Sequence, residues 1–426
     1  LINQSKTFEN MEDSYVEDFF VVNRWILKFG CLWKPDSQNN TIQSLYTIYV
    51  IATFLFVNMF FTFTEFLSIL DVYGNEYDLI KNISFALTHF MGAVKVVFFY
   101  LYGDTLKSIM NTLQSSELHY EYCCADDLFF PGKTSKLYKA VGIKYTIIFF
   151  IMAHATITSS YLPPLIAAIK SEANNTEKML PDKLPYYSWM PFKFDTPCTY
   201  LIALGYQAIP MFSYVYSIVG MDTLFMNIMN CISMNLEIVQ GALISIFPRA
   251  VAKTNGPLMT PDELENTKTL ATHLRAEMKK ISKHLQIIYK ACDDLEDVHK
   301  YLTLAQTTAT LFILCSCLYL VSTTPIGSKQ FFAEIVYMIA MGFQLTLYCW
   351  FGNEITIKAN NLPFYIWQCD WLTADKDFKM SMILSMARAK RPLHLTAGKF
   401  APLTLPTFVS ILKVSYSFYA VIKNTE

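Results

Sequence analysis

Long apolar stretches separated by polar segments dominate the pattern along the chain. Seven of them reach about 20 residues with few charges, the length that a helix needs to cross the hydrocarbon core of a bilayer. The predicted spans are residues 44–70, 80–102, 137–169, 197–222, 300–322, 330–351 and 401–422. The pattern therefore predicts an all-α protein with seven membrane-spanning helices.

The fourth span is followed by further apolar sequence, because residues 197–247 contain only two charged residues, Asp222 and Glu237. We expect this helix to continue out of the membrane rather than to break near Pro210 or Gly220. Residues 19–29 predict a short amphipathic helix on the membrane surface. Residues 249–261 are expected to form a short loop.

Two polar segments carry helical patterns outside the membrane. In the first, apolar residues recur at spacings of three and four, as in a heptad seam: Ala271, Leu274, Met278, Ile281, Leu285, Ile288, Cys292 and Leu295. This seam either packs against the preceding helix of the same chain or also contributes to an oligomer contact. The second segment, residues 375–389, repeats Phe378, Met382, Ile383 and Met386 before Pro392 stops the helix.

The basic residues between the spans predict the orientation, since positively charged loops tend to stay in the cytoplasm. Twenty-two lysines and arginines fall on the side of the N-terminus and seven on the other side. We therefore expect the N-terminus inside and the C-terminus outside, the reverse of a G-protein-coupled receptor.

The spans and the segments between them divide the chain into six parts. These are residues 1–43 with the surface helix, 44–248 with spans one to four, 249–299 as a cytoplasmic helical anchor, 300–351 with spans five and six, 352–400 as anchor helix and linker, and 401–426 as the last span.

Composition supports a membrane protein and excludes several classes of function. The chain is 53% hydrophobic and only 16% charged, whereas globular proteins have about 25% charged residues. A net charge of −1 argues against nucleic acid as a partner. The ten cysteines contain no C-x-x-C pair, the glycines form no phosphate-binding loop, and the seven histidines form no H-E-x-x-H motif. We expect no enzyme activity, metal or cofactor.

Among the charged residues in the apolar stretches, Glu65, Lys95, Glu237, Glu334 and Lys413 raise the question of a charge at bilayer depth. A charge at bilayer depth costs a few kcal/mol on insertion scales, so it is either paired or functional. We expect each of these side chains to be paired between helices. Lys413 is notable because it stands near the middle of the last span.

The C-terminal third resembles the insect odorant receptors in three short stretches: RP at 391–392, LTAGKF at 395–400 and SILKVSYSF at 410–418. The resemblance implies a subunit of a ligand-gated cation channel, with four subunits around one pore that the last span of each lines. It implies a tuning subunit in a heterotetramer with a shared co-receptor, in the plasma membrane of a sensory-neuron dendrite. An ungapped match places an apolar gate at Val421 and a polar constriction at Asn424 and Thr425.

The resemblance also implies a pocket for a small volatile ligand in the outer half of the bundle, between the second, third, fourth and sixth spans. Such a pocket is mostly apolar with a few polar groups. The candidates on those four spans are Ile83, Phe85, His89 and Phe90; Phe150, His154 and Thr158; Tyr206 and Ile209; and Ile335, Tyr337 and Met338. His154 and Tyr206 are the preferred polar contacts, although each also fits a side chain that hydrogen-bonds a neighbouring helix.

Other functions share parts of this pattern. A gustatory receptor has the same architecture and differs in its closing motif. A G-protein-coupled receptor has the opposite orientation, and a secondary transporter needs inverted repeats, which the sequence does not display. The predicted partners are thus a small volatile organic ligand, a co-receptor and membrane lipid.

Overall fold

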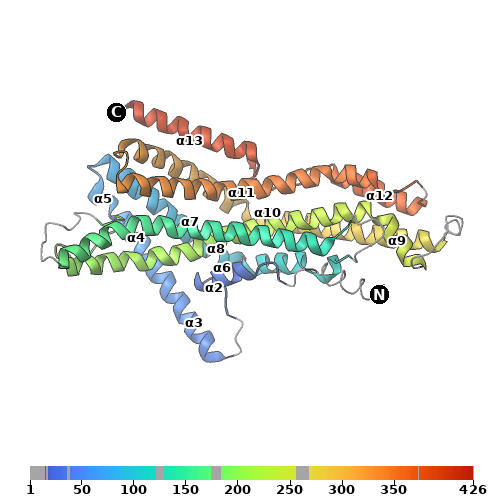
Figure 1. Cartoon of the computed structure of the whole chain (residues 1–426), viewed down its shortest axis with the longest axis horizontal. Helices are drawn as coiled ribbons and strands as arrows, with labels where there is room; N and C mark the ends of the chain where they lie inside the picture. Colours follow the sequence, from blue (N-terminus) through green and yellow to red (C-terminus); the bar gives the residue numbers. More distant parts are fainter. Residues whose placement is uncertain are drawn as a thin grey trace.

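The computed structural model describes residues 15, 18–35, 39–120, 129–173, 184–255, 268–372 and 374–425. Long helices run side by side along the longest axis and form an elongated bundle (Figure 1). The elements are α2 (Val21–Phe29), α3 (Asn40–Thr53), the π-helix η1 (Phe54–Phe61), α4 (Thr62–Leu67), α5 (Ile69–Val72), α6 (Glu76–Leu113), the 3₁₀-helix η2 (Ser116–Leu118), α7 (Pro131–Ala173), α8 (Pro197–Ile244), α9 (Ile246–Asn255), α10 (Lys268–Thr323), α11 (Lys329–Gln368), α12 (Lys376–Ala389), β1 (Thr396–Ala397), β2 (Ala401–Pro402) and α13 (Leu405–Thr425).

Among the described residues, seven helices are long and apolar enough to cross a membrane. They are the composite helix from α3 to α5, then α6, α7, α8, α10, α11 and α13, and they confirm the seven-span prediction. Several helices extend far beyond a bilayer, because α8 has 48 residues, about 72 Å at 1.5 Å per residue. The expected continuation of the fourth span is confirmed, and α8 passes both Pro210 and Gly220 without a break.

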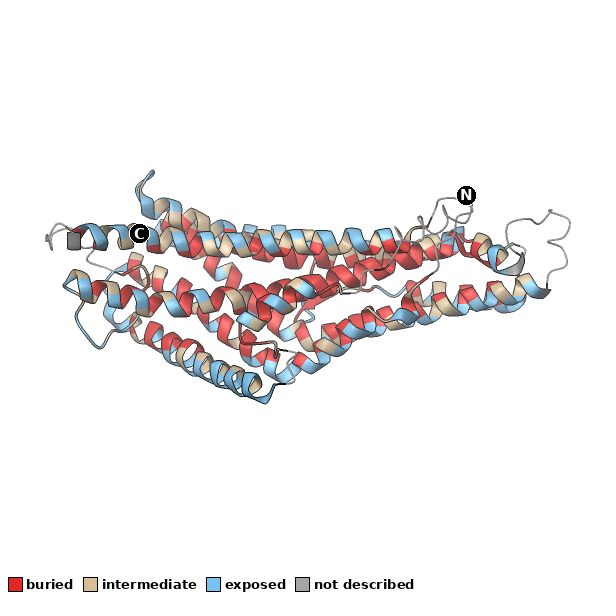
Figure 2. Cartoon of the chain, turned by 60° about the horizontal axis from the view of Figure 1, so that its bottom comes forward, coloured by how far each residue is buried: buried red, intermediate tan, exposed pale blue. Residues whose placement is uncertain are grey.

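The core of the bundle surrounds α8. Nearly every α8 residue beyond Val219 is buried, and α8 packs against α2, α6, α7, α10 and α11. Buried residues accordingly line the inner faces of the long helices (Figure 2). The apolar seam of α10 is buried from Leu274 to Leu295, with Ala271 half-buried, and it packs within the chain. Its contribution to an oligomer contact stays a prediction.

Two predicted boundaries are wrong. Residues 249–255 belong to α9 and are not a loop, while residues 256–261 lie outside the described part of the chain. The last helix begins at Leu405 rather than at residue 401, because Ala401–Pro402 pairs antiparallel with Thr396–Ala397. Pro406 then stands in the first turn of α13. Backbone N–H groups in the first turn have no intrahelical acceptor, so a proline, which has no N–H, costs no hydrogen bond there.

A glycine is required at the turn of this hairpin. Gly398 has a φ of +62°, and a Cβ atom there would lie 2.6 Å from Cδ2 of Leu304 on α10. The Gly398 amide also donates to the carbonyl of Lys300 at 2.8 Å. The hairpin is therefore seated directly on α10, and this contact fixes the point from which α13 begins.

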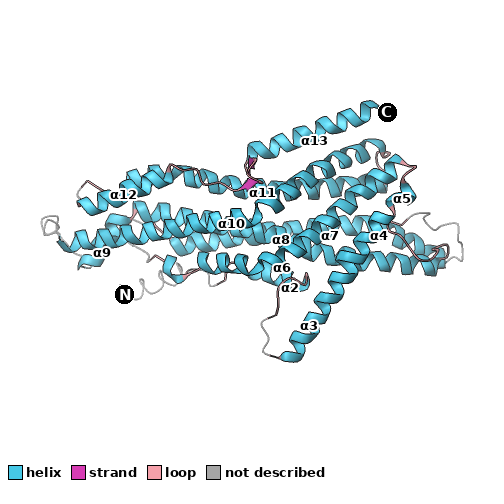
Figure 3. Ribbon diagram, turned by 180° about the vertical axis from the view of Figure 1, so that it is seen from behind, coloured by secondary structure: helices cyan, strands magenta, loops and turns pink. Residues whose placement is uncertain are grey.

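Two apolar helices pack loosely against the rest of the chain. In α13 only 6% of the membrane-spanning window is buried, against 22–61% in the other spans. Helix α3 has no buried residue and projects from the bundle, as Figure 3 shows from behind. Their exposed apolar surfaces are left for lipid or for other protein subunits.

Candidate functional site

A cavity of about 100 Å³ lies among α6, α7, α8 and α11. Most of its wall is apolar and comes from residues far apart in sequence. The apolar lining consists of Phe85, Phe149, Ala153, Ile157, Met211, Val215, Ile218, Val219, Ala340 and Met341. Polar groups are interspersed at Thr88, His89, Thr156, Tyr186, Tyr214, Tyr337 and Gln344. An apolar cavity with a few polar groups suits a small, mostly apolar molecule.

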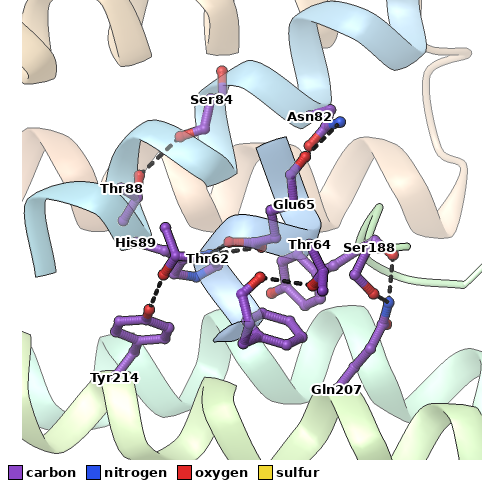
Figure 4. Close-up of polar contacts among 12 residues, drawn as sticks. Thr62, Thr64, Glu65, Asn82, Ser84, Thr88, His89, Ser188, Gln207 and Tyr214 are labelled. Carbon is purple, nitrogen blue, oxygen red and sulfur yellow. Dashed lines mark hydrogen bonds and ion pairs between the residues drawn. The ribbon is translucent and has the colours of Figure 1, made fainter. Parts of the chain in front are cut away.

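His89 is held in the wall by two neighbours. Its Nδ1 lies 2.8 Å from both carboxylate oxygens of Glu65 on α4, and its ring stacks on Tyr214 of α8 with centroids 4.6 Å apart. Glu65 is only 1% exposed, so this contact supplies the partner that a buried carboxyl group requires. Figure 4 shows these side chains converging from three elements of the bundle.

The π-helix η1 joins the first span to this wall. The hydroxyl of Tyr214 lies 3.0 Å from the carbonyl of Val57. It also lies 2.5 Å from the hydroxyl of Thr62 (Figure 4). π-helical turns often mark functional sites, because they disturb the regular hydrogen bonding of the α-helix. The first span is thus tied to the cavity through Tyr214.

The segment between α7 and α8 contributes Tyr186 to the cavity wall. Tyr186 from this segment packs edge-to-face on Phe85 with ring centroids 4.7 Å apart, and its carbonyl accepts from Nε2 of Gln207 at 2.6 Å. Burial raises the pKa of the Tyr186 phenol above its usual range, so the phenol stays protonated. A second, more polar cavity of about 560 Å³ lies beside this segment and shares Phe85 with the first.

On α11, Tyr337 and Gln344 contribute polar groups two turns apart. The Tyr337 hydroxyl lies 2.6 Å from that of Thr88 on α6. The Gln344 side-chain amide donates to the carboxylate of Asp222 on α8. Both residues therefore face the cavity while being hydrogen-bonded to other helices.

The structure brings three predicted ligand-binding residues together in the cavity wall: Phe85, His89 and Tyr337. The others lie elsewhere. Ile83, Phe90, Thr158 and Ile209 are exposed on the outside of the chain, and Ile335 and Met338 are half-buried on α11.

The preferred polar candidates belong to two separate aromatic clusters. His154 stands among Phe150, Phe212 and Tyr216, and its Nδ1 lies 2.9 Å from the Phe150 carbonyl. Tyr206 packs against Phe56 and Phe61, with ring centroids 5.9 and 5.8 Å away. Neither residue lines the cavity, and their role in ligand response stays a prediction.

Sequence reasoning missed much of the lining for a simple reason. On α7 the cavity is lined by Phe149, Ala153 and Ile157, each adjacent in sequence to Phe150, His154 or Thr158 but rotated by about 100° around a helix. The apolar residues of α7 occur on all faces of the helix, so its hydropathy pattern does not show which face points toward the cavity. On α8 the lining begins at Met211, deeper than Tyr206 and Ile209. Gln344 was detectable only as a polar residue in the sixth span.

The expected pairing of the charged residues between helices is confirmed for four of the five residues. Lys95 pairs with Asp222 at 2.6 Å, Glu65 with His89, Glu334 with Lys81 at 3.3 Å, and Glu237 with Lys358 at 2.7 Å. Lys413 differs, because it is exposed on α13. Its expected partner between helices stays a prediction.

The predicted pore residues lie at the last turns of α13. Val421 is 61% exposed, Asn424 is also exposed, and the side chain of Thr425 is outside the described residues. Along α13, contacts to the chain include a hydrogen bond from the Ser415 hydroxyl to the Leu311 carbonyl at 3.1 Å. The gate role of these residues stays a prediction.

Comparison with known proteins identifies the family. The family model described as 7tm Odorant receptor matches residues 76–416. The odorant receptor Or1 of Anopheles gambiae is 21% identical over 96% of both chains, and the odorant receptor 94a of Drosophila melanogaster is 25% identical over 57% of this chain and 59% of its own. Relatives of this kind are receptors and not enzymes.

The fold also matches solved structures of the insect olfactory receptor OR5 from Machilis hrabei. One superposes with a TM-score of 0.74 at 14% identity, covering 96% of this chain and all of the other. The complex of that receptor with eugenol gives a TM-score of 0.70 at 15% identity. With seven apolar helices and a family match over most of its length, this chain is a multi-pass membrane protein of the seven-transmembrane odorant receptor family.

Proposed function

We propose that the chain is the odorant-binding subunit of a ligand-gated cation channel, and that its ligand occupies the cavity among α6, α7, α8 and α11. The observation that carries this proposal is the cavity itself, which has apolar walls and a few fixed polar groups. At about 100 Å³ it is smaller than the roughly 300–1,000 Å³ typical of pockets for drug-sized ligands. A cavity of this size suits a small ligand, and the related receptor OR5 has been solved in complex with the small molecule eugenol.

Helix α13 supplies the wall of the pore in this proposal. Its loose packing leaves most of its surface for neighbouring subunits, as a helix around a shared axis requires. Four subunits, including a shared co-receptor, surround the pore in the plasma membrane of a sensory neuron. The N-terminus lies inside the cell and the C-terminus outside, as the distribution of basic residues favours. Val421 closes the pore by dewetting.

Ligand binding opens the channel by a population shift. The ligand binds the open arrangement more tightly than the closed one, so its differential affinity moves the equilibrium. Polar groups in the wall, above all His89 with its Glu65 partner, orient the ligand by hydrogen bonding.

Co-expression with a co-receptor in an otherwise silent cell tests the function. Currents are recorded over a panel of small volatiles for the chain alone, the co-receptor alone and both together. We expect a volatile-dependent current that requires this chain. Identical responses with and without it contradict the proposal, and antibody access to a C-terminal tag in intact cells tests the orientation separately.

A further inference from the structure

The cavity has one polar side chain that reaches two other helices at once. Gln344 of α11 lines the cavity and is only 3% exposed. Its amide nitrogen donates to the carboxylate of Asp222 on α8, and its amide oxygen accepts from Nε2 of Gln306 on α10 at 3.1 Å. A movement of the Gln344 side chain therefore alters hydrogen bonds to both α8 and α10.

Asp222 makes the position of the Gln344 amide energetically important. This carboxylate is fully buried and accepts hydrogen bonds from Lys95 at 2.6 Å and from the Tyr348 hydroxyl at 2.7 Å, in addition to Gln344. A buried carboxylate that loses a donor is strongly disfavoured. A ligand that attracts the Gln344 amide thus competes with Asp222, which gives the side chain two alternative positions.

Helix α10 connects this point to α13. The Gln306 amide also donates to the hydroxyl of Thr310 at 3.0 Å, one turn further along α10. The next residue, Leu311, accepts the hydrogen bond from Ser415 of α13 at 3.1 Å. Beside it, the rings of Phe312 and Phe418 stack at 6.5 Å. The contacts from Gln344 to α13 are continuous through little more than one turn of a rigid helix.

We propose that Gln344 is a positioning residue that couples occupancy of the cavity to α13. The hydrogen bonds of its amide join α8 to α10 and hold α10 in the arrangement that favours a closed pore. A ligand carrying a hydroxyl or carbonyl group draws the amide into the cavity, which releases Gln306 and lets α10 shift against Ser415. This inference rests on the proposed channel function and adds to it the residue that transmits the signal.

The test measures current without any ligand, because the coupling acts on the closed state. Gln344→Met keeps the side-chain length but removes the hydrogen bonds of the amide. Gln306→Leu removes the hydrogen bond to Gln344 from the α10 side, and Gln306 does not line the cavity. Each is recorded in the complex with the co-receptor, with the basal current normalised to the receptor at the cell surface. Gln368→Met makes the same chemical change at an exposed glutamine of α11 that does not line the cavity, and it is the matched control.

We expect each single variant to raise the basal current, within the roughly 5- to 150-fold range of allosteric couplings. The basal current of the double variant Gln344→Met, Gln306→Leu should equal that of the single variant with the larger effect, since both substitutions break the same hydrogen bond. The basal current of Gln368→Met should stay within about twofold of wild type. Unchanged or lowered basal currents, or effects that multiply in the double variant, overturn the proposal.

If Gln306→Leu does not reach the cell surface, Ser415→Ala combined with Gln344→Met provides a second test. Ser415→Ala removes one hydroxyl from α13 and is expected to raise the basal current without adding to Gln344→Met. Independent, multiplying effects of these two variants overturn the coupling. A complex of wild-type chain and co-receptor that carries no current in any condition contradicts the channel function instead, so the two failures are distinguishable.

Discussion

Lys95 and Asp222 form an ion pair 2.6 Å long inside the helix bundle, and their side chains are 1% and 0% exposed. Lys95 lies on α6 and Asp222 on α8, so the pair joins two membrane-spanning helices. Tyr348 and Gln344 of α11 complete the hydrogen bonding of the carboxylate. One carboxylate therefore organises the contact of three helices.

Removing one member of this pair should destabilise the protein severely. Asp222→Leu leaves the Lys95 charge buried without its partner, and we expect a loss of about 3–5 kcal/mol in the free energy of unfolding. Thermal unfolding of the detergent-solubilised protein and its abundance at the cell surface measure the effect. The double variant Lys95→Met, Asp222→Leu should recover most of the loss.

The exposed pair of Lys107 with Asp104 at 3.0 Å provides the control for that experiment. Asp104→Ala should change stability by less than about 1 kcal/mol, because surface ion pairs contribute little. Equal effects of Asp222→Leu and Asp104→Ala would contradict the importance of the buried pair.

Filling the cavity should weaken the response to ligand while leaving the pore intact. Ala153 lines the cavity, whereas Ala155 is exposed on another face of α7. In Ala153→Phe the new ring occupies space in a cavity of about 100 Å³, so we expect the half-maximal ligand concentration to rise at least about tenfold. Dose–response currents measure it, with Ala155→Phe as the matched variant that should behave like wild type. A wild-type dose response for Ala153→Phe would show that the ligand binds outside this cavity. His154→Ala and Tyr206→Ala in the same assay test whether the two aromatic clusters contribute to the ligand response.

A larger side chain at Val421 should alter ion flux and leave ligand binding unchanged. Val421→Trp adds bulk at an exposed position near the end of α13, where we propose the gate. We expect the maximal current to change by about tenfold or more at an unchanged half-maximal concentration, since dewetting depends steeply on pore radius. Tyr416→Trp, at another exposed position of α13, is the comparison. Wild-type currents and ion selectivity in Val421→Trp would remove Val421 from the gate.

The hairpin before α13 should not tolerate a side chain at Gly398. The φ of +62° and the 2.6 Å approach to Leu304 both oppose a Cβ atom, and the backbone strain alone is worth about 1–3 kcal/mol. We expect Gly398→Ala to lower the thermal midpoint and the surface abundance. Gly205→Ala is the control, because a Cβ there meets nothing within 4 Å and alanine favours a helix. A Gly398→Ala protein as stable as wild type would contradict the tight seating of the hairpin on α10.

The candidate site was only partly predictable, and the difference lies in helix rotation. The four helices that the family resemblance implied surround the cavity, and Phe85, His89 and Tyr337 are in its wall. On α7 the sequence indicated His154 where the structure places Ala153 and Ile157 in the lining. An apolar helix in a membrane can turn about its axis without changing its hydropathy, because lipid and the protein interior are equally apolar.

The sequence by itself determined the number of spans, the long extension of the fourth span and the need for partners at Lys95 and Glu334. Those features follow from the thickness of a bilayer and from the unfavourable energy of an unpaired charge inside it. Only the tertiary structure decided that Asp222 is the partner of Lys95, that Gln344 lies between the cavity and α10, and that α13 begins at Leu405. Such choices depend on which helix faces meet in space, and the contacts of Asp222 with Lys95 and Gln344 join residues more than a hundred positions apart in the chain.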